Sequence, residues 1–105
     1  MTNGFYNSIA MNKHLSDSCE VSFQVLNKDS IPIKNVIIEI LNTNGFTEKY
    51  LTNEEGKVCN VSIEGSLKYA FVFNKDGYFQ EKIFTETPCD SKKLVIVLRS
   101  NLIIH

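Results

Sequence analysis

The sequence of 105 residues has no tryptophan, only two prolines and no cluster of basic residues. Its formal net charge is -1, and its longest basic run is the pair Lys92 and Lys93. A nucleic acid or an anionic membrane would require a concentration of Lys and Arg that this sequence lacks. No stretch approaches the roughly 20 apolar residues that span a bilayer. We therefore expect neither nucleic-acid binding nor membrane insertion.

The first 17 residues lack both the basic segment and the apolar segment of a standard secretion signal. The sequence therefore predicts a cytoplasmic protein, and export by a leaderless route is the alternative. Lysine outnumbers arginine ten to one, which is typical of proteins from AT-rich genomes and points to a bacterial source.

Cysteine is also scarce, and the three that occur, Cys19, Cys59 and Cys89, form no closely spaced pair. An odd number of cysteines without a CxxC motif favours free thiols in a reducing compartment, with a bond between Cys59 and Cys89 as the alternative. A zinc site would need a fourth ligand, for which His14 is the nearby candidate, and the spacing matches no known zinc motif. We therefore expect no metal and no cofactor.

The sequence contains many short runs in which apolar and polar residues alternate. Val21, Phe23 and Val25 alternate with polar neighbours, a pattern that gives a strand one buried and one solvent-facing side. Similar runs, separated by turn signals such as the NG pair at 44–45, predict strands at 20–26, 35–41, 46–52, 57–63, 67–74, 78–85 and 94–99. In the fourth of these strands, alternation places Cys59 on the core side. The sequence predicts an all-β, seven-stranded antiparallel Greek-key sandwich over residues 19–100.

The two ends of the chain differ from the sandwich between them. Residues 1–18 form an arm, either a short helix or an extended segment, with apolar residues at helix-like spacing. Residues 101–105 form an apolar tail, which we expect either to pack on its own sandwich or to add a strand to a neighbouring chain. The candidate partner-binding residues in these two ends are Phe5, Tyr6, Ile9, Leu102, Ile103 and Ile104.

Four landmarks of turn and strand follow one another in order along the sandwich. They are residues 25–36 (VLNKDSIPIKNV), residues 51–58 (LTNEEGKV), Tyr69 just after the turn at 64–66, and residues 74–78 (NKDGY) followed by the strand at 94–98. This order resembles the carboxypeptidase regulatory-like domain, a transthyretin-like (prealbumin-like) sandwich of Ig-like form, over about residues 20–99. Turns of that family usually carry Gly where this chain has Ser30 and Asn35, so we expect a different conformation in those turns.

The resemblance implies a module for folding support, adhesion or interaction, and not an enzyme. Hydroxyisourate hydrolases of related fold need paired histidines within the sandwich, whereas His14 and His105 lie outside the predicted strands. Pilin-type relatives form a Lys–Asn isopeptide bond from a Lys in the first strand, and residues 20–26 contain none. Lys28 with Asn101 and Glu39 is the formal combination that this chain offers.

The function predicted from these observations is binding or structural support. No residue pattern provides a general acid and base, an activated nucleophile or a phosphate loop. We predict a non-catalytic protein-interaction or structural module, an accessory or adaptor component of a larger assembly such as secretion or contractile-injection machinery. Its partner would be another protein or a second copy, bound through edge strands or termini. The alternative is a small-ligand or carbohydrate-binding module that uses Tyr50 and Tyr78.

Overall fold

The computed structural model describes residues 18–102, which contain seven strands and one short 3-10 helix. Each predicted strand is present, and in β1 apolar and polar residues alternate as the sequence indicates. The elements are β1 (Ser18–Leu26), β2 (Ile37–Asn42), β3 (Thr47–Leu51), β4 (Lys57–Glu64), β5 (Tyr69–Asn74), β6 (Glu81–Thr85), η2 (Pro88–Asp90) and β7 (Lys93–Val97).

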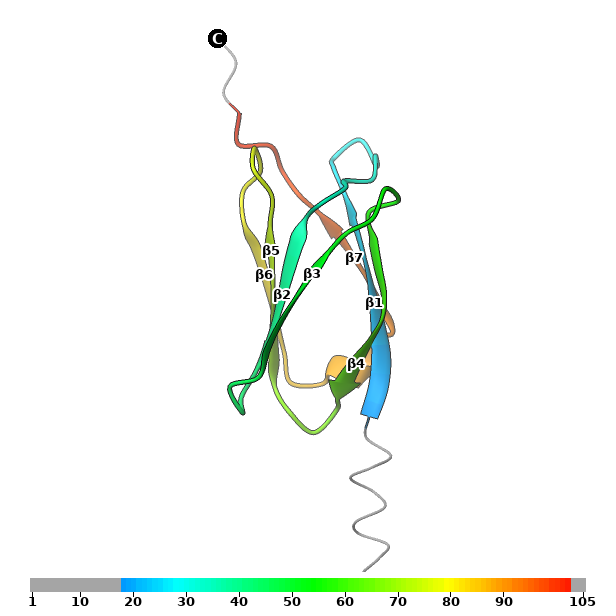
Figure 1. Cartoon of the computed structure of the whole chain (residues 1–105), viewed down its shortest axis with the longest axis vertical. Coiled ribbons are helices and arrows are strands. Elements are labelled where there is room, and N and C mark those ends of the chain that lie inside the picture. The colour runs from blue at the N-terminus through cyan, green and yellow to red at the C-terminus, as the bar shows by residue number, and fades with distance from the viewer. Residues whose placement is uncertain (1–17, 103–105) are drawn as a thin grey trace, which may run out of the picture.

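The strands form two sheets that pack face to face as a sandwich (Figure 1). One sheet has the order β4-β1-β7 and the other the order β3-β2-β5-β6. The predicted sandwich is confirmed, and its paired strands are antiparallel apart from β1 and β7, which run parallel. β1 starts at the lower end in Figure 1 and the chain leaves β7 toward the upper end. The described chain therefore enters at one end of the sandwich and leaves at the other.

Inward-facing side chains from both sheets form one apolar core. Phe23 of β1 contacts Phe71 and Phe73 of β5 edge to face, with ring centroids 5.1 and 6.0 Å apart. These rings belong to different sheets and are at most 1% exposed, so they join the two layers. The alternation of β1 thus places Phe23 in the core, as predicted, and β5 adds Phe71 and Phe73 from the other sheet.

Three of the connecting turns share one construction. Each begins with an asparagine whose side-chain oxygen accepts hydrogen bonds from the backbone N–H groups two and four residues later, at 2.8–3.1 Å. The fourth residue of each turn has a positive φ. A short amide side chain can reach the backbone beyond it in this way. The turns begin at Asn27, Asn42 and Asn53, and their fourth residues are Ser30, Gly45 and Gly56.

Ser30 and Asn35 take a backbone conformation that is uncommon for residues other than glycine. Both residues adopt the left-handed region, with φ of 65° and 63°, which is the region that glycine enters most easily. At Ser30 the asparagine turn requires this φ, because the backbone N–H of Ser30 donates to the carbonyl of Asn27 at 2.9 Å. Asn35 is a residue type that tolerates this region, and its N–H donates to the carbonyl of Thr52 at 3.0 Å.

Thr52 is a polar side chain in the core, only 2% exposed. Its hydroxyl donates to the carbonyl of Ile33 at 2.7 Å and accepts from the N–H of Val36 at 2.9 Å. Both partners lie in the corner between β1 and β2. The hydroxyl of Thr52, the residue after β3, therefore satisfies buried backbone groups of that corner.

The prediction that Cys59 faces the core was wrong. β4 contains a bulge: Val21 of β1 pairs with Val61, but Phe23 pairs with Val58, so Cys59 and Asn60 together oppose one residue of β1. The extra residue reverses the phase of the alternation, and Val58 takes the core position while Cys59 is exposed.

The cysteines pair in a way that the sequence did not predict. A disulfide joins Cys19 and Cys89, whose Cα atoms are 5.8 Å apart, and Cys59 is free and exposed. The expectation of free thiols therefore fails for two of the three cysteines, and the alternative pair was wrong as well. Cys19 lies at the start of β1 and Cys89 lies in η2, just before β7. Because β1 and β7 are parallel neighbours, their starting ends lie at the same end of the sandwich.

Candidate functional site

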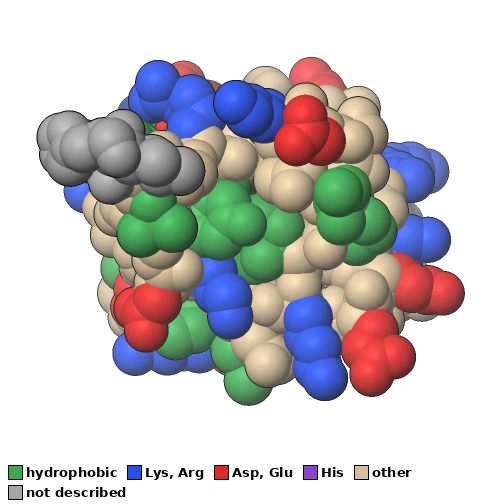
Figure 2. Space-filling view, turned by 90° about the horizontal axis from the view of Figure 1, so that it is seen from above, with side chains coloured by type: hydrophobic (Ala, Val, Ile, Leu, Met, Phe, Trp, Pro, Cys, Tyr) green, Lys and Arg blue, Asp and Glu red, His purple; other side chains and the backbone are tan. Residues whose placement is uncertain are grey.

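A groove of about 540 Å³ opens at the end of the sandwich where the chain leaves β7. One side comes from the Asn27 turn and the other from the segments after β5 and β7. Seen from above, this end gathers hydrophobic side chains near its centre, with basic and acidic side chains around them (Figure 2). The residues that line the groove are Asn27, Lys28, Asp29, Tyr78, Phe79, Leu98, Arg99, Ser100 and Leu102. We call this the end groove.

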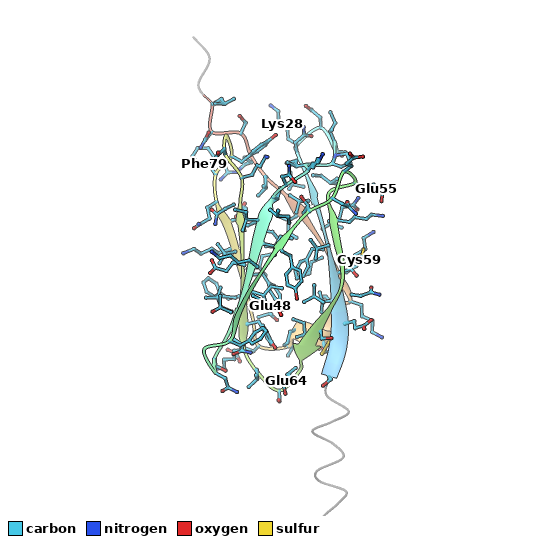
Figure 3. All side chains as sticks on the ribbon, in the orientation of Figure 1. Lys28, Glu48, Glu55, Cys59, Glu64 and Phe79 are labelled. Carbon is cyan, nitrogen blue, oxygen red and sulfur yellow. A yellow bond between two sulfur atoms is a disulfide. The ribbon has the colours of Figure 1, made fainter. Side chains whose placement is uncertain are left out.

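Backbone pairing holds the two segments of the end groove together. The N–H of Phe79 donates to the carbonyl of Arg99 at 2.9 Å, and the N–H of Asn101 donates to the carbonyl of Gly77 at 3.0 Å. The guanidinium of Arg99 lies 5.5 Å from the centroid of the Phe79 ring, a cation–π contact. Phe79 and Lys28 lie at this end of the molecule, and Glu64 lies at the opposite end (Figure 3). The groove is therefore apolar at its base and carries charge of both signs at its rim.

The structure brings two of the predicted site residues together. Tyr78, predicted for ligand binding, and Leu102, predicted for partner binding, line the same end groove. Leu102 is exposed, whereas Tyr78 is half-buried and packs against the core. The other partner-binding candidates, Phe5, Tyr6, Ile9, Ile103 and Ile104, lie outside the described residues.

Tyr50 lies apart from this groove, on the edge strand β3. Its hydroxyl donates a hydrogen bond to the carboxylate of Glu48, and its ring packs partly against the core. The hydrogen bond to Glu48, followed by partial burial and the charge of Glu48, raises the pKa of Tyr50 to about 12. The hydroxyl thus already has a partner, and Tyr50 does not join Tyr78 in one aromatic surface.

The four edge strands differ in how their outer backbone groups are protected. β3 carries Glu48 and Lys49, and β6 carries Glu81 and Lys82. β4 carries the bulge at Cys59 and Asn60. Charges and bulges on an edge strand hinder pairing with another chain. β7 has neither device after its first residue: its sequence is KLVIV.

The free edge of β7 presents both backbone groups and apolar side chains. Val95 and Val97 are 54% and 47% exposed. Toward β1, the carbonyl of Lys92 accepts from the N–H of Ser22, and the N–H of Leu98 donates to the carbonyl of Leu26, both at 2.9 Å. Alternate residues of a parallel strand bond to opposite sides, so the backbone groups of residues 93, 95 and 97 face away from β1.

A second groove, of about 240 Å³, lies in the seam between β6 and β7. Apolar side chains that pack against the core form its floor, namely Phe71, Ile83 and Leu94. The sequence reasoning missed both this seam and the open edge beside it. A signal was present, since residues 94–98 are five consecutive apolar residues (LVIVL). The side chains of this strand that face away from the core are therefore apolar as well.

Among residues 18–102, no group of three or more His, Cys, Asp or Glu side chains is placed to hold a metal ion. In the same range, no helix is long and apolar enough to cross a membrane. Of the residues considered for an isopeptide bond, Glu39 lies mid-strand on β2, opposite Lys49 and Val72, and Lys28 lies in the Asn27 turn.

Comparison with known proteins identifies similar folds but no family. No protein-family model matches the sequence, and no curated protein matches it either. Two solved structures of a C-terminal fragment of pilus adhesin SpaC from Lactobacillus rhamnosus GG are similar, with TM-scores of 0.62 and 0.61 at 11% and 9% identity. The matched regions cover 83% and 84% of this chain and 47% of the fragment in each structure. The Bacillus anthracis TIE protein is similar with a TM-score of 0.51 at 19% identity, over 80% of this chain and 16% of that protein.

At these identities the likeness concerns the fold alone. The chain spans about half the length of the adhesin fragments that it matches. The comparisons thus agree with the observed β-sandwich.

Proposed function

We propose that this chain is a non-catalytic structural and protein-interaction module that joins parts of a larger protein assembly. The observation that carries the proposal is the placement of the first and last strands. β1 begins at one end of the sandwich, β7 leads out at the other, and the two pair in parallel. Without the disulfide, a pull between residues 18 and 102 would slide β7 along β1 and load their hydrogen bonds together. The bond between Cys19 and Cys89 ties the two strands at their starting ends.

The disulfide also bears on where the module works. Structural disulfides persist in oxidising environments and are rare in the reducing cytosol. The bond between Cys19 and Cys89 therefore supports the export alternative over a cytoplasmic location. We propose that the domain works outside the reducing cytoplasm, and that its partner is another protein.

We propose further that the sandwich is transthyretin-like, of the carboxypeptidase regulatory-like type. Two observations support it. The four sequence landmarks fall on strand ends and turns in the expected order, and Ser30 and Asn35, at positions where the family usually carries Gly, have a positive φ, which glycine adopts most easily. The fold likeness to pilus adhesin fragments supports a pilus-like or adhesin-like assembly as the setting, and secretion or contractile-injection machinery is a related alternative.

Force spectroscopy on a tandem array of the full chain tests the structural role. With the disulfide intact, a pull can straighten only the ~13 residues after Cys89, whose full length is about 45 Å at roughly 3.5 Å per residue; the added length is this value less the distance that the segment already spans. After reduction, the ~85 described residues can all extend to about 300 Å, and each step is this length less the folded distance between residues 18 and 102. We expect the end-to-end pull to produce the short steps of the oxidised chain only at a higher force than a pull through an attachment at Lys92, which would peel β7 from β1. If the end-to-end pull extends the oxidised chain at the same force as the peeling pull, the structural role is refuted.

A second candidate, binding of a small ligand or carbohydrate, is favoured by the presence of Tyr78 beside Phe79 and Arg99 in the end groove. Aromatic rings and a guanidinium can together contact a sugar ring and its hydroxyls. A glycan array and a thermal-shift screen test this idea, with Phe79→Ala as the variant expected to lose binding. Absence of any ligand in both screens would leave the structural role as the function.

A further inference from the structure

We propose that the free edge of β7 accepts an extended strand from a partner protein, one that has alternating apolar residues in its centre and acidic residues at its ends. This inference rests on the proposed interaction role and names the surface and the chemistry of the partner. Three features of the molecule support it: the unpaired backbone of β7, the apolar seam next to it, and the charges at both ends of the strand.

The backbone of β7 is prepared for another strand. The residues whose N–H and C=O groups face away from β1 are 93, 95 and 97, as the hydrogen bonds of Lys92 and Leu98 to β1 require. The next residue of this set is Arg99, and its carbonyl already accepts the N–H of Phe79 at 2.9 Å. The same side of the chain thus pairs with a neighbouring segment just above β7, and along β7 itself no strand of residues 18–102 pairs with it.

The seam groove supplies the side-chain specificity. Alternate side chains of an added strand would point into the sandwich, where Ile83, Leu94 and Phe71 form the floor of the 240 Å³ groove. The intervening side chains would lie on the outer face beside Val95 and Val97, which are about half exposed. A strand with β-branched residues at alternate positions fits both sides, and about five residues match the length of β7.

The charges at the ends of β7 indicate the flanking residues of the partner strand. Lys92 and Lys93 stand at its start and Arg99 just beyond its end, while Asp90 is the acidic residue that lines the groove. Positive charge therefore predominates at both ends of an apolar stretch. Acidic residues on each side of the apolar centre of a partner strand would complement it, whereas a second copy of β7 would bring further basic residues to the same places.

Amide exchange provides the first test, because it measures the free edge directly. In the unbound protein, the N–H groups of Val95 and Val97 should exchange at least tenfold faster than those of Leu94 and Ile96, which face β1. Equal protection of these four groups would overturn the geometry on which the inference stands.

Titration with synthetic peptides, followed by NMR of the isotope-labelled full chain, tests the partner chemistry. The probe alternates valine and threonine between pairs of glutamates, and we expect it to shift the amide signals of Val95, Val97 and Ile83. The same peptide with lysines in place of the glutamates should bind about tenfold more weakly. A peptide with N-methyl groups on the pairing side should not bind at all. No shift with the glutamate peptide at millimolar concentration overturns the inference.

The protein variant Val95→Pro removes the outward N–H without touching the ladder to β1, and proline is tolerated at such edge positions. We expect it to bind the glutamate peptide at least tenfold more weakly, whereas Val95→Thr should bind as the natural chain does. Shifts along β7 that depend on protein concentration without peptide would make a second copy the occupant and overturn the proposal. None of these results alters the force needed to extend the oxidised chain, so a failure here is distinguishable from a failure of the structural role.

Discussion

Removal of the bond between Cys19 and Cys89 is expected to lower the free energy of unfolding by about 4 kcal/mol. The two cysteines are separated by 70 residues in sequence. In the chain-entropy description, a cross-link that closes a loop of this length lowers the entropy of the unfolded chain by about 15 cal/mol/K, which corresponds to about 4 kcal/mol at 25 °C. Because small domains are stable by roughly 5–15 kcal/mol in total, the loss is a large part of the stability.

The assay is urea unfolding of the natural chain, with and without reductant, and of the double variant Cys19→Ala, Cys89→Ala. The reduced chain and the double variant should unfold at nearly the same urea concentration, and their melting temperature should fall by roughly 20 °C. The slope of the transition should rise in both, because an unfolded chain without the cross-link exposes more surface. Cys59→Ser is the matched control, since Cys59 is exposed and free, and it should change the stability by less than about 0.5 kcal/mol.

Two results would contradict this reasoning. If reductant shifts the unfolding free energy of the natural chain by less than about 1 kcal/mol, the cross-link does not constrain the unfolded chain as the loop-closure argument requires. If instead Cys59→Ser loses the response to reductant, the bond involves Cys59 and the assigned pair is wrong.

Further predictions concern the turns and Tyr50. Gly56→Ala should lower the free energy of unfolding by more than about 3 kcal/mol, because a Cβ there would overlap the carbonyl oxygen of the neighbouring strand. Gly45→Ala has a similar φ and nothing within 4 Å, so it should lower the same free energy by about 1 kcal/mol in the urea assay. Asn53→Ala removes the acceptor of two backbone hydrogen bonds and should lower the free energy of unfolding by about 1–2 kcal/mol. Asn53→Asp keeps the acceptor and should lower it by less than about 0.5 kcal/mol. Equal losses of stability in the two variants would show that the side-chain oxygen is unimportant. The pKa of Tyr50, raised to about 12, means that the neutral hydroxyl stabilises the fold below about pH 10 and that this contribution is lost as the pH rises toward 12. Glu48→Gln should return the ultraviolet titration of this tyrosine toward pH 10, and an unchanged titration would remove Glu48 as the cause.

Much of the fold follows from local chemistry and could be predicted. The alternation of Val21, Phe23 and Val25 depends on nothing beyond the strand itself, and all three are buried as expected. The turns are equally local, because the asparagine at the start of each turn binds the backbone within the next four residues. Even the positive φ of Ser30 has a local cause: the turn geometry imposed by Asn27 outweighs the steric preference of serine for negative φ.

What could not be predicted depends on which strands become neighbours. The bond of Cys19 to Cys89 requires that β1 and β7 run parallel side by side, and the sequence carries no local sign of that pairing. The same pairing decides which side of β7 is used and which is open. An apolar run such as LVIVL reads equally well as a strand buried on both faces and as an edge strand. Its position beside β1, at the edge of the three-stranded sheet, turns Val95 and Val97 from apparent core residues into the surface on which we expect a partner strand to bind.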